Sequence, residues 1–277
     1  MNLFGKAPRP STTARGPTAT DGPPLPPSFF IPLVPPRVSR TLIAINLLVF
    51  AATFLYGLVE YRVWNGPTNL QVLFDLGMKS NLHILYGQSW RLFTAMFLHI
   101  GPIHLISNLI GLFWLGPIIE GHFGHFRFAV IYLLGGLLGS IASYAFSPAL
   151  SAGASGAVFA LLGATIVYFY RFRDNMGRQG QTMLQSALVL LIINLVLGFS
   201  VTNVDNWGHM GGLAGGAIIA IGLLPRYRTP APAILRFGRQ PLIREPRIVR
   251  TLAWTLLCAL LFFAAFQIAT LVGPPLR

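Results

Sequence analysis

The chain has 277 residues, of which 54% are hydrophobic and only 10% charged, and its mean hydropathy is +0.64. Because soluble domains average about 25% charged residues, this composition excludes an ordinary soluble protein and favours one that crosses a lipid bilayer several times. The net charge of +13 does not indicate a nucleic-acid partner, since the basic residues lie mainly between apolar runs and form no basic-aromatic groove.

The first 38 residues are rich in Pro, Gly, Ser and Thr, as in the stretch "APRPSTTARGPTATDGPPLPP". A segment of this composition does not bury enough apolar surface to fold by itself. We therefore expect residues 1–38 to form a disordered cytoplasmic tail.

Apolar runs of about 20 residues follow, the length that a helix needs to cross a bilayer. They predict seven membrane spans, at about 41–60, 102–121, 126–146, 155–170, 183–202, 207–224 and 251–272. Residues 61–100 form a long loop after the first span, and its apolar part, 91–99, is predicted to lie in the membrane interface. The polar stretch "RFRDNMGRQGQT" after the fourth span is expected to be a solvated turn.

These spans divide the chain into a membrane domain at 39–225, a basic cytoplasmic linker at 226–250, and a seventh helix with a short outer tail at 251–277. The expected fold is an all-α multi-pass membrane protein. With a cytoplasmic N-terminus, 16 of the Lys and Arg residues lie inside and 4 outside. Positive charge marks the cytoplasmic side, so the even-numbered spans begin at the outer face.

Four polar side chains lie where an apolar span is expected: His104 and Asn108 in the second span, Ser155 in the fourth, and His209 in the sixth. Polar groups inside a membrane are costly and suggest function. All four are near the outer ends of their spans. The fourth span, with a length of about 24 Å against a core of about 30 Å, predicts that Ser155 is recessed below the membrane surface.

Small residues accompany these polar groups at helical spacing. His209, Gly212 and Gly216 share one helical face, and the fourth span has a matching face, made of Gly156, Ala160 and Gly163. Small residues let membrane helices approach closely. If the two faces pack together, Ser155 and His209 come within reach of each other.

A serine hydroxyl becomes a good nucleophile when a base takes its proton, and imidazole is such a base near pH 7. The tetrahedral intermediate of acyl transfer needs hydrogen-bond donors for its oxyanion, and both His104 and Asn108 can donate. Each residue also has a structural interpretation, with Ser155 and His209 as packing residues and the other two as interhelical bonds. Asp205 is expected to be solvated in the outer loop, which favours a Ser-His dyad without an acid.

At these residues the sequence resembles the rhomboid family of intramembrane serine proteases. The family's G-x-S-G corresponds to Gly153-Ala154-Ser155-Gly156, its H-x-x-G-x-x-x-G to His209, Gly212 and Gly216, and its H-x-x-x-N to His104 and Asn108. The resemblance covers about 41–224, and also includes the pair Trp90-Arg91, a further histidine at His99, and Glu120 at the inner end of the second span.

The resemblance implies a six-helix core plus one extra C-terminal helix, with Ser155 and His209 as the catalytic dyad. His104, Asn108 and the Ser155 backbone would serve the oxyanion, and the glycines Gly153, Gly156, Gly212 and Gly216 together with Trp90, Arg91 and Glu120 would be structural. Substrates would be single-span membrane proteins, cut near the outer face without a metal or other cofactor. The resemblance implies a bacterial cell membrane with the active site facing outward, and leaves the oligomeric state open.

Two other functions stay open at this point. A non-catalytic rhomboid-like protein would bind membrane spans and guide their trafficking or degradation, but such proteins typically lack the dyad. A secondary transporter would show an internal repeat and charges near the bilayer midplane. The sequence shows no such repeat, and Glu120 lies near the inner end of its predicted span rather than at the midplane.

Overall fold

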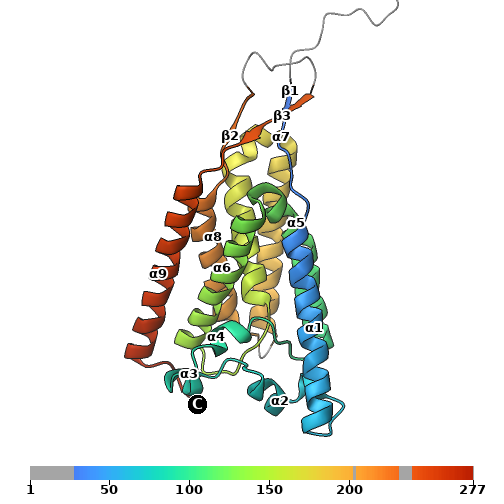
Figure 1. The fold of residues 1–277 in the computed structure, drawn as a ribbon, viewed down its shortest axis with the longest axis vertical. Helices are drawn as coiled ribbons and strands as arrows, with labels where there is room; N and C mark the ends of the chain where they lie inside the picture. The colour runs from blue at the N-terminus through green and yellow to red at the C-terminus, as the bar shows by residue number, and fades with distance from the viewer. Residues whose placement is uncertain (1–27, 202–203, 231–238, 277) are drawn as a thin grey trace, which may run out of the picture.

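The computed structural model describes residues 28–201, 204–230 and 239–276. The part of the predicted tail at 1–27 lies outside the described residues. Long helices run side by side along the longest dimension of the molecule, with small strand pairs at one end and short helices at the other (Figure 1). This arrangement confirms the prediction of an all-α membrane protein.

The predicted spans correspond to long helices, each of which coincides with an apolar run. They are α1 (Arg37–Glu60), α5 (Pro102–Phe123), α6 (His125–Phe146), α7 (Ser155–Ser200), α8 (Asn206–Leu223) and α9 (Ile248–Val272). In the described part of the chain, five helices are long and apolar enough to cross a membrane: α1, α5, α6, α7 and α9. The 18-residue α8 is not among them, because Asn206 and His209 lower the hydropathy of its first turn.

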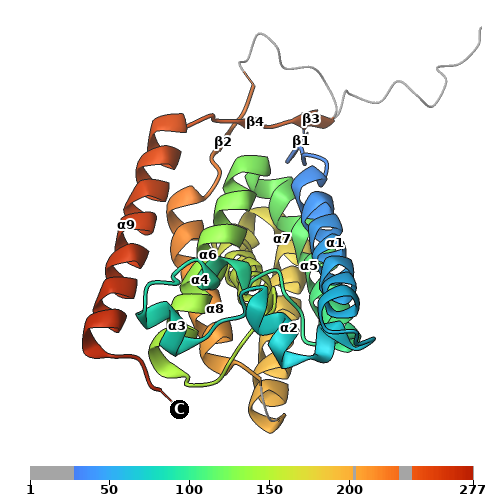
Figure 2. The same cartoon turned by 60° about the horizontal axis from the view of Figure 1, so that its bottom comes forward.

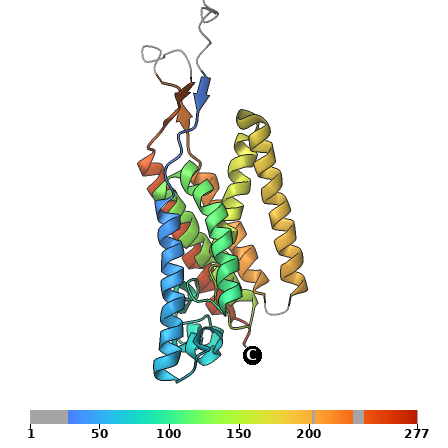
Figure 3. The ribbon, with the colours of Figure 1, turned by 90° about the vertical axis from the view of Figure 1, so that its right-hand side faces the viewer.

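The helix α7 contains both the fourth and the fifth predicted spans. It has 46 residues and reverses direction at Gly177, whose φ of 56° and ψ of −139° are not helical, and Figure 3 shows its two arms as a hairpin. The fourth predicted span ends at 170, whereas the helix continues to Gly177. Residues 171–176 contain no proline or glycine, so nothing interrupts the backbone hydrogen bonds there.

The helix α8 packs against both α6 and α7, and small residues set the distance of approach. A Cβ atom added to Gly212 would lie 2.0 Å from the carbonyl oxygen of Gly156. One added to Gly216 would lie 2.0 Å from the carbonyl oxygen of Ala160. The structure thus brings the two small-residue faces into backbone contact, which places the first turns of α7 and α8 side by side.

The long loop between α1 and α5 folds into short helices rather than remaining extended. They are η1 (Gly66–Thr68), α2 (Leu70–Asp75), α3 (Asn81–Leu85) and α4 (Arg91–Thr94), and Figure 2 shows α2, α3 and α4 together at one end of the bundle. Buried Arg91 holds them together, since its Nη1 donates to the carbonyl oxygens of Phe74 (2.7 Å) and Met78 (3.1 Å).

The opposite end of the bundle carries two strand pairs. β1 (Ser28–Phe30) runs parallel to β3 (Arg239–Pro241), and β2 (Tyr227–Arg228) runs antiparallel to β4 (Ile243–Arg244). Residues 28–36 were expected in the disordered tail and 239–250 in a plain linker. The structure pairs Ser28–Phe30 with Arg239–Pro241, so that each strand supplies backbone hydrogen-bond partners that the other needs.

The seventh predicted span, α9, is attached to α6 near both ends. Arg127 Nε donates to Thr251 Oγ1 (3.2 Å), and the hydroxyls of Tyr144 and Thr270 lie 3.3 Å apart. Between these points Cys258 is fully buried, as expected for a small apolar side chain. The helix is therefore part of the bundle, at the edge away from α1 (Figure 1).

Candidate active site

Ser155 is the first residue of α7, and its side chain is half-buried. It lines a small cavity of about 30 Å³, together with Ser140, Ser151, Asp205 and Gly208. A cavity that holds a water molecule needs only about 10–15 Å³ of such volume. The serine hydroxyl is thus next to a space that is partly polar and large enough for water.

The segment that leads into Ser155 is held from two sides. The N–H of Gly153 donates to the carbonyl oxygen of Ala95 (2.8 Å), and Lys79 and Ser151 exchange backbone hydrogen bonds (2.8 and 3.3 Å). The φ of Gly153 is +143°, a value that favours glycine. A Cβ atom at this position would lie 2.6 Å from Cε1 of His104. The glycine therefore lets the His104 ring approach the chain directly before Ser155.

His209 lies in the first turn of α8, where its ring stacks on Phe159 with a centroid distance of 4.3 Å and an interplanar angle of 9°. Phe159 is four residues after Ser155 on α7, so both lie on the same face of that helix. The stacking therefore holds the His209 imidazole one helical turn from Ser155. No hydrogen bond joins the two side chains among the described residues; such bonds are often long in enzymes without substrate.

His104 lies in the first turn of α5, next to the segment that leads into Ser155. Its Nδ1 accepts a hydrogen bond from the N–H of Ile100 (3.4 Å). Because Nδ1 uses its lone pair in this bond, the ring proton is on Nε2. The Nε2 atom is 2.8 Å from the position of a Cβ on Gly153, so this N–H lies next to the entry to Ser155. Asn108 is buried one turn further, and its Nδ2 donates to the His104 carbonyl (2.9 Å).

Asp205 is placed differently from the expectation of a solvated loop residue. It is half-buried, and its carboxylate caps α8 by accepting from the N–H of Gly208 (3.0 Å). Aspartate is favoured at this position because it satisfies a free N–H at the start of a helix. The carboxylate is thus bound to the backbone, and among the described residues it makes no hydrogen bond to the His209 ring.

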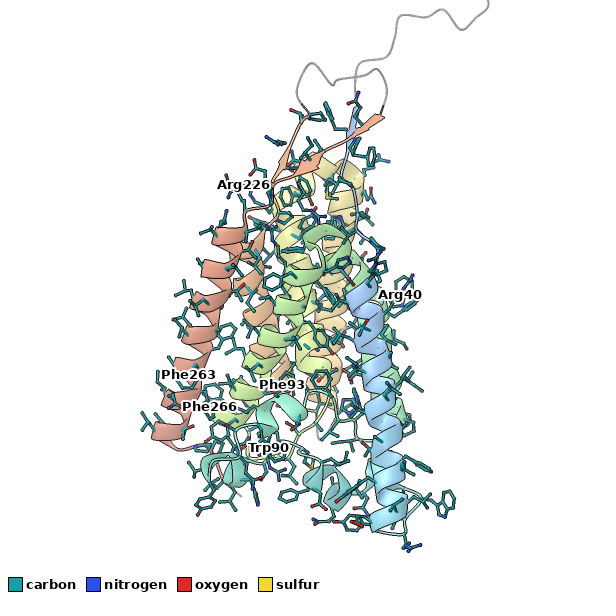
Figure 4. The ribbon with its side chains drawn as sticks, viewed as in Figure 1. Arg40, Trp90, Phe93, Arg226, Phe263 and Phe266 are labelled. Atoms are coloured by element: carbon teal, nitrogen blue, oxygen red, sulfur yellow. The ribbon has the colours of Figure 1, made fainter. Side chains whose placement is uncertain are left out.

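The remaining predicted residues lie away from this cavity. Trp90 and Arg91 belong to the loop between α1 and α5, where the Arg91 guanidinium lies over the Trp90 ring at 4.9 Å; Figure 4 shows Trp90 at this end of the bundle. Glu120 lies at the other end. Its carboxylate accepts from the N–H groups of Val38 (2.7 Å) and Ser39 (2.8 Å) and contacts His125 Nδ1 (2.5 Å). It therefore holds the start of α1 against α5.

Two residues that lie at the site were not predicted from the sequence. Phe159 carries the ring on which His209 stacks, and the signal for it is its spacing of four residues from Ser155. Ser140 contributes a hydroxyl to the cavity from α6, but one serine in an apolar helix has no distinguishing pattern. His99 was predicted only from its position in the family resemblance. Its Nε2 accepts a hydrogen bond from the N–H of Ala154 (3.5 Å).

Comparison with known proteins identifies the class. Residues 86–226 match the Rhomboid domain family, and the chain belongs to the rhomboid family of integral membrane proteins. It is 42% identical over 190 residues to the rhomboid protease GluP of Bacillus subtilis (strain 168), which covers 68% of this chain and 35% of that protein.

Two further relatives are also similar to this chain. The putative rhomboid protease YdcA of Bacillus subtilis (strain 168) is 32% identical over 173 residues, 61% of this chain and 85% of that protein. RHOMBOID-like protein 7 of Arabidopsis thaliana is 40% identical over 141 residues, 50% of this chain and 44% of that protein. The chain spans well under two thirds of the length of GluP and of RHOMBOID-like protein 7, so the similarity concerns only part of each of these proteins.

Proposed function

We propose that this protein is an intramembrane serine endopeptidase, with Ser155 as nucleophile and His209 as general base and acid. The observation that carries the proposal is the backbone contact between α7 and α8 at Gly156 and Gly212, which places the serine and the histidine on facing first turns. The named proteases among its relatives support the same activity.

In the proposed reaction His209 takes the proton of the Ser155 hydroxyl as its oxygen attacks the scissile carbonyl carbon. The C–O bond forms, and the carbonyl oxygen becomes an oxyanion. His209 then gives the proton to the leaving amine as the C–N bond breaks. A water molecule attacks the resulting acyl-enzyme in the same way and restores the serine. The cavity beside Ser155 is large enough to hold that water.

The oxyanion would be stabilised by donors from two elements. The Nε2–H of His104 lies beside the entry to α7, and the free N–H groups of the first turn of α7 point toward the same region. Asn108 has its amide committed to the His104 carbonyl in this structure. It acts here by fixing the turn that carries His104, and its second amide hydrogen is left for the oxyanion.

The proposed substrates are single-span membrane proteins, cut near the outer face, in a bacterial cell membrane. The membrane-spanning helices of this chain support substrates that reach the site from the bilayer. The alternative is a non-catalytic binder of membrane spans. It is less favoured because a binder needs neither a stacked histidine opposite Ser155 nor a water-sized cavity beside it.

Replacement of Ser155 by alanine tests the proposal directly. In the purified full chain with a model single-span substrate, Ser155→Ala should lower the cleavage rate about a thousandfold or more. His209→Ala should have a similar effect, and the double variant should be no worse, because the two act as one unit.

The control is Ser107→Ala. Ser107 is exposed on α5 and bonds only to its own helix, through the Ile103 carbonyl (2.9 Å), so its loss should leave cleavage unchanged. Labelling by a fluorophosphonate probe should require Ser155 and His209. If Ser155→Ala cleaves at the rate of the unmodified chain, the protein is not a serine protease of this kind.

A further inference from the structure

The inner ends of α6 and α9 enclose a buried guanidinium group that is only partly bonded. Arg127 is 8% exposed. Its Nε donates to Thr251 Oγ1, but its Nη1 is buried and has no hydrogen-bond partner among the described residues. An unpaired buried donor on a charged group is costly, so the side chain is well placed to bind an anion.

Three further arginines gather around it. The charges of Arg244, Arg247 and Arg250 all act on the Arg127 guanidinium. Arg244 donates from Nη2 to the Gly121 carbonyl (2.9 Å), while its Nε is buried without a partner. Glu245 pairs with Arg247 (3.1 Å). In the described part of the chain no carboxylate forms an ion pair with any of the other three, so the group carries an excess of positive charge.

Two helix N-termini add to this field. α6 begins after Gly124 and α9 begins after Arg247, and neither has a side-chain cap. The first N–H groups of a helix are free, and its dipole places partial positive charge there. Such ends are favourable sites for phosphate. Both helices therefore contribute donors to the region that already holds the four arginines.

The place of this cluster in the membrane indicates which anion it meets. α6 and α9 are membrane-spanning helices, and their N-termini lie on the side of the bundle that carries the strand pairs and Arg226 (Figure 4). The first turns of α9 also expose apolar side chains to the bilayer, namely Ile248, Val249 and Leu252. A lipid can satisfy both features, with a phosphate against the arginines and acyl chains along α9.

We propose that Arg127, Arg244, Arg247 and Arg250 form a binding site for the phosphate of an anionic phospholipid in the inner leaflet. The lipid fastens α9 to α6. It neutralises charges that otherwise repel one another where the linker meets the membrane domain. The site lies at the opposite end of the bundle from Ser155, and it does not depend on the proposed protease activity.

The experiment measures lipid-dependent stability of the purified full chain in a neutral detergent. Dioleoylphosphatidylglycerol should raise the thermal unfolding midpoint saturably, whereas dioleoylphosphatidylcholine and inorganic phosphate should not. Native mass spectrometry should detect the bound phosphatidylglycerol. Arg127→Gln should weaken the apparent affinity about tenfold, as expected for the loss of a charged hydrogen bond.

A second variant and a control keep the test independent of folding defects. Arg250 is exposed, so Arg250→Gln should fold normally and still weaken the lipid effect. Arg178→Gln removes the same charge on the same side of the membrane but beyond Gly177, and should bind as the unmodified chain does. Equal stabilisation by both lipids, equal stabilisation by inorganic phosphate, or unchanged affinity in Arg250→Gln and Arg127→Gln would overturn the proposal.

Discussion

His99 connects the loop between α1 and α5 to the segment that precedes Ser155. It is 1% exposed, its Nδ1–H donates to the Phe97 carbonyl (3.2 Å), and its Nε2 accepts from the N–H of Ala154 (3.5 Å). This pattern requires the neutral ring. Burial, together with the nearby His104, lowers the pKa of His99 to about 4. The same side chain is thus a positioning residue and a source of pH dependence.

The pH dependence has a definite sign. The unfolded chain binds a proton at His99 near pH 6.5, whereas the folded chain does so only near pH 4. As the pH falls through this window, the unfolded state takes up a proton first, and the folded state loses about 3 kcal/mol of stability. Replacement by glutamine should remove this part of the pH dependence.

The measurement is the thermal unfolding midpoint between about pH 7 and about pH 5, in the unmodified chain and in His99→Gln. The variant is expected to show a smaller fall in the midpoint on acidification. An equal fall in both chains would mean that His99 does not titrate differently in the folded state.

Two glycines at the contact between α7 and α8 differ in how strictly the packing requires them. At Gly212 a Cβ atom would lie 2.0 Å from a backbone oxygen, but at Gly156 the nearest atom would be 3.4 Å away. The first distance is a clash and the second an ordinary contact. Both glycines belong to the family's motifs, yet only Gly212 is required for the packing of the two helices.

This difference predicts that replacement by alanine affects stability differently at the two glycines. Gly212→Ala should lower the free energy of unfolding by about 1–3 kcal/mol, as overpacking does. Gly156→Ala should change it by less than about 0.5 kcal/mol or stabilise the chain slightly, because alanine favours a helix. Thermal unfolding in detergent measures both. Equal destabilisation by the two variants would show that α7 and α8 pack differently.

At the scale of the whole molecule, α9 connects segments that are far apart in the sequence. Asn81, in the loop between α1 and α5, donates to the Pro275 carbonyl (2.7 Å), and Trp254 of α9 lies against Gly222 of α8. Along α9, Phe262 is 5% exposed and Phe263 is 60% exposed. The former faces the bundle, and the latter, labelled in Figure 4, faces the surroundings. The helix α9 and the residues that follow it therefore link the loop between α1 and α5 to α8.

Adjacent phenylalanines on α9 allow a matched test of this attachment. Phe262→Ala should destabilise the chain by on the order of 2 kcal/mol, because it opens a cavity at a packed helix contact. Phe263→Ala should have little effect, since lipid or detergent replaces the lost contacts. Unfolding midpoints in detergent compare the two. A larger loss for Phe263→Ala would mean that α9 presents its other face to the bundle.

Much of the architecture could be predicted from the sequence because membrane helices are specified locally. A helix in lipid must satisfy its backbone hydrogen bonds within itself, so each apolar run of sufficient length appears as a helix. The spacing of His209, Gly212 and Gly216 likewise indicates one face without any knowledge of its partner. Ser155, His209, His104 and Asn108 were recognised in this way, as polar groups at matching depths.

Other features were decided by contacts between distant segments, which leave no local pattern. The ring of Phe159 under His209, the bond from His99 to Ala154, and the cap that Asp205 forms all depend on how separate elements meet. The same holds for β1, a part of the predicted tail that pairs with β3. The charge excess around Arg127 also exists only in the folded chain, because Arg127 and Arg244 are distant in sequence and meet where α6 and α9 begin.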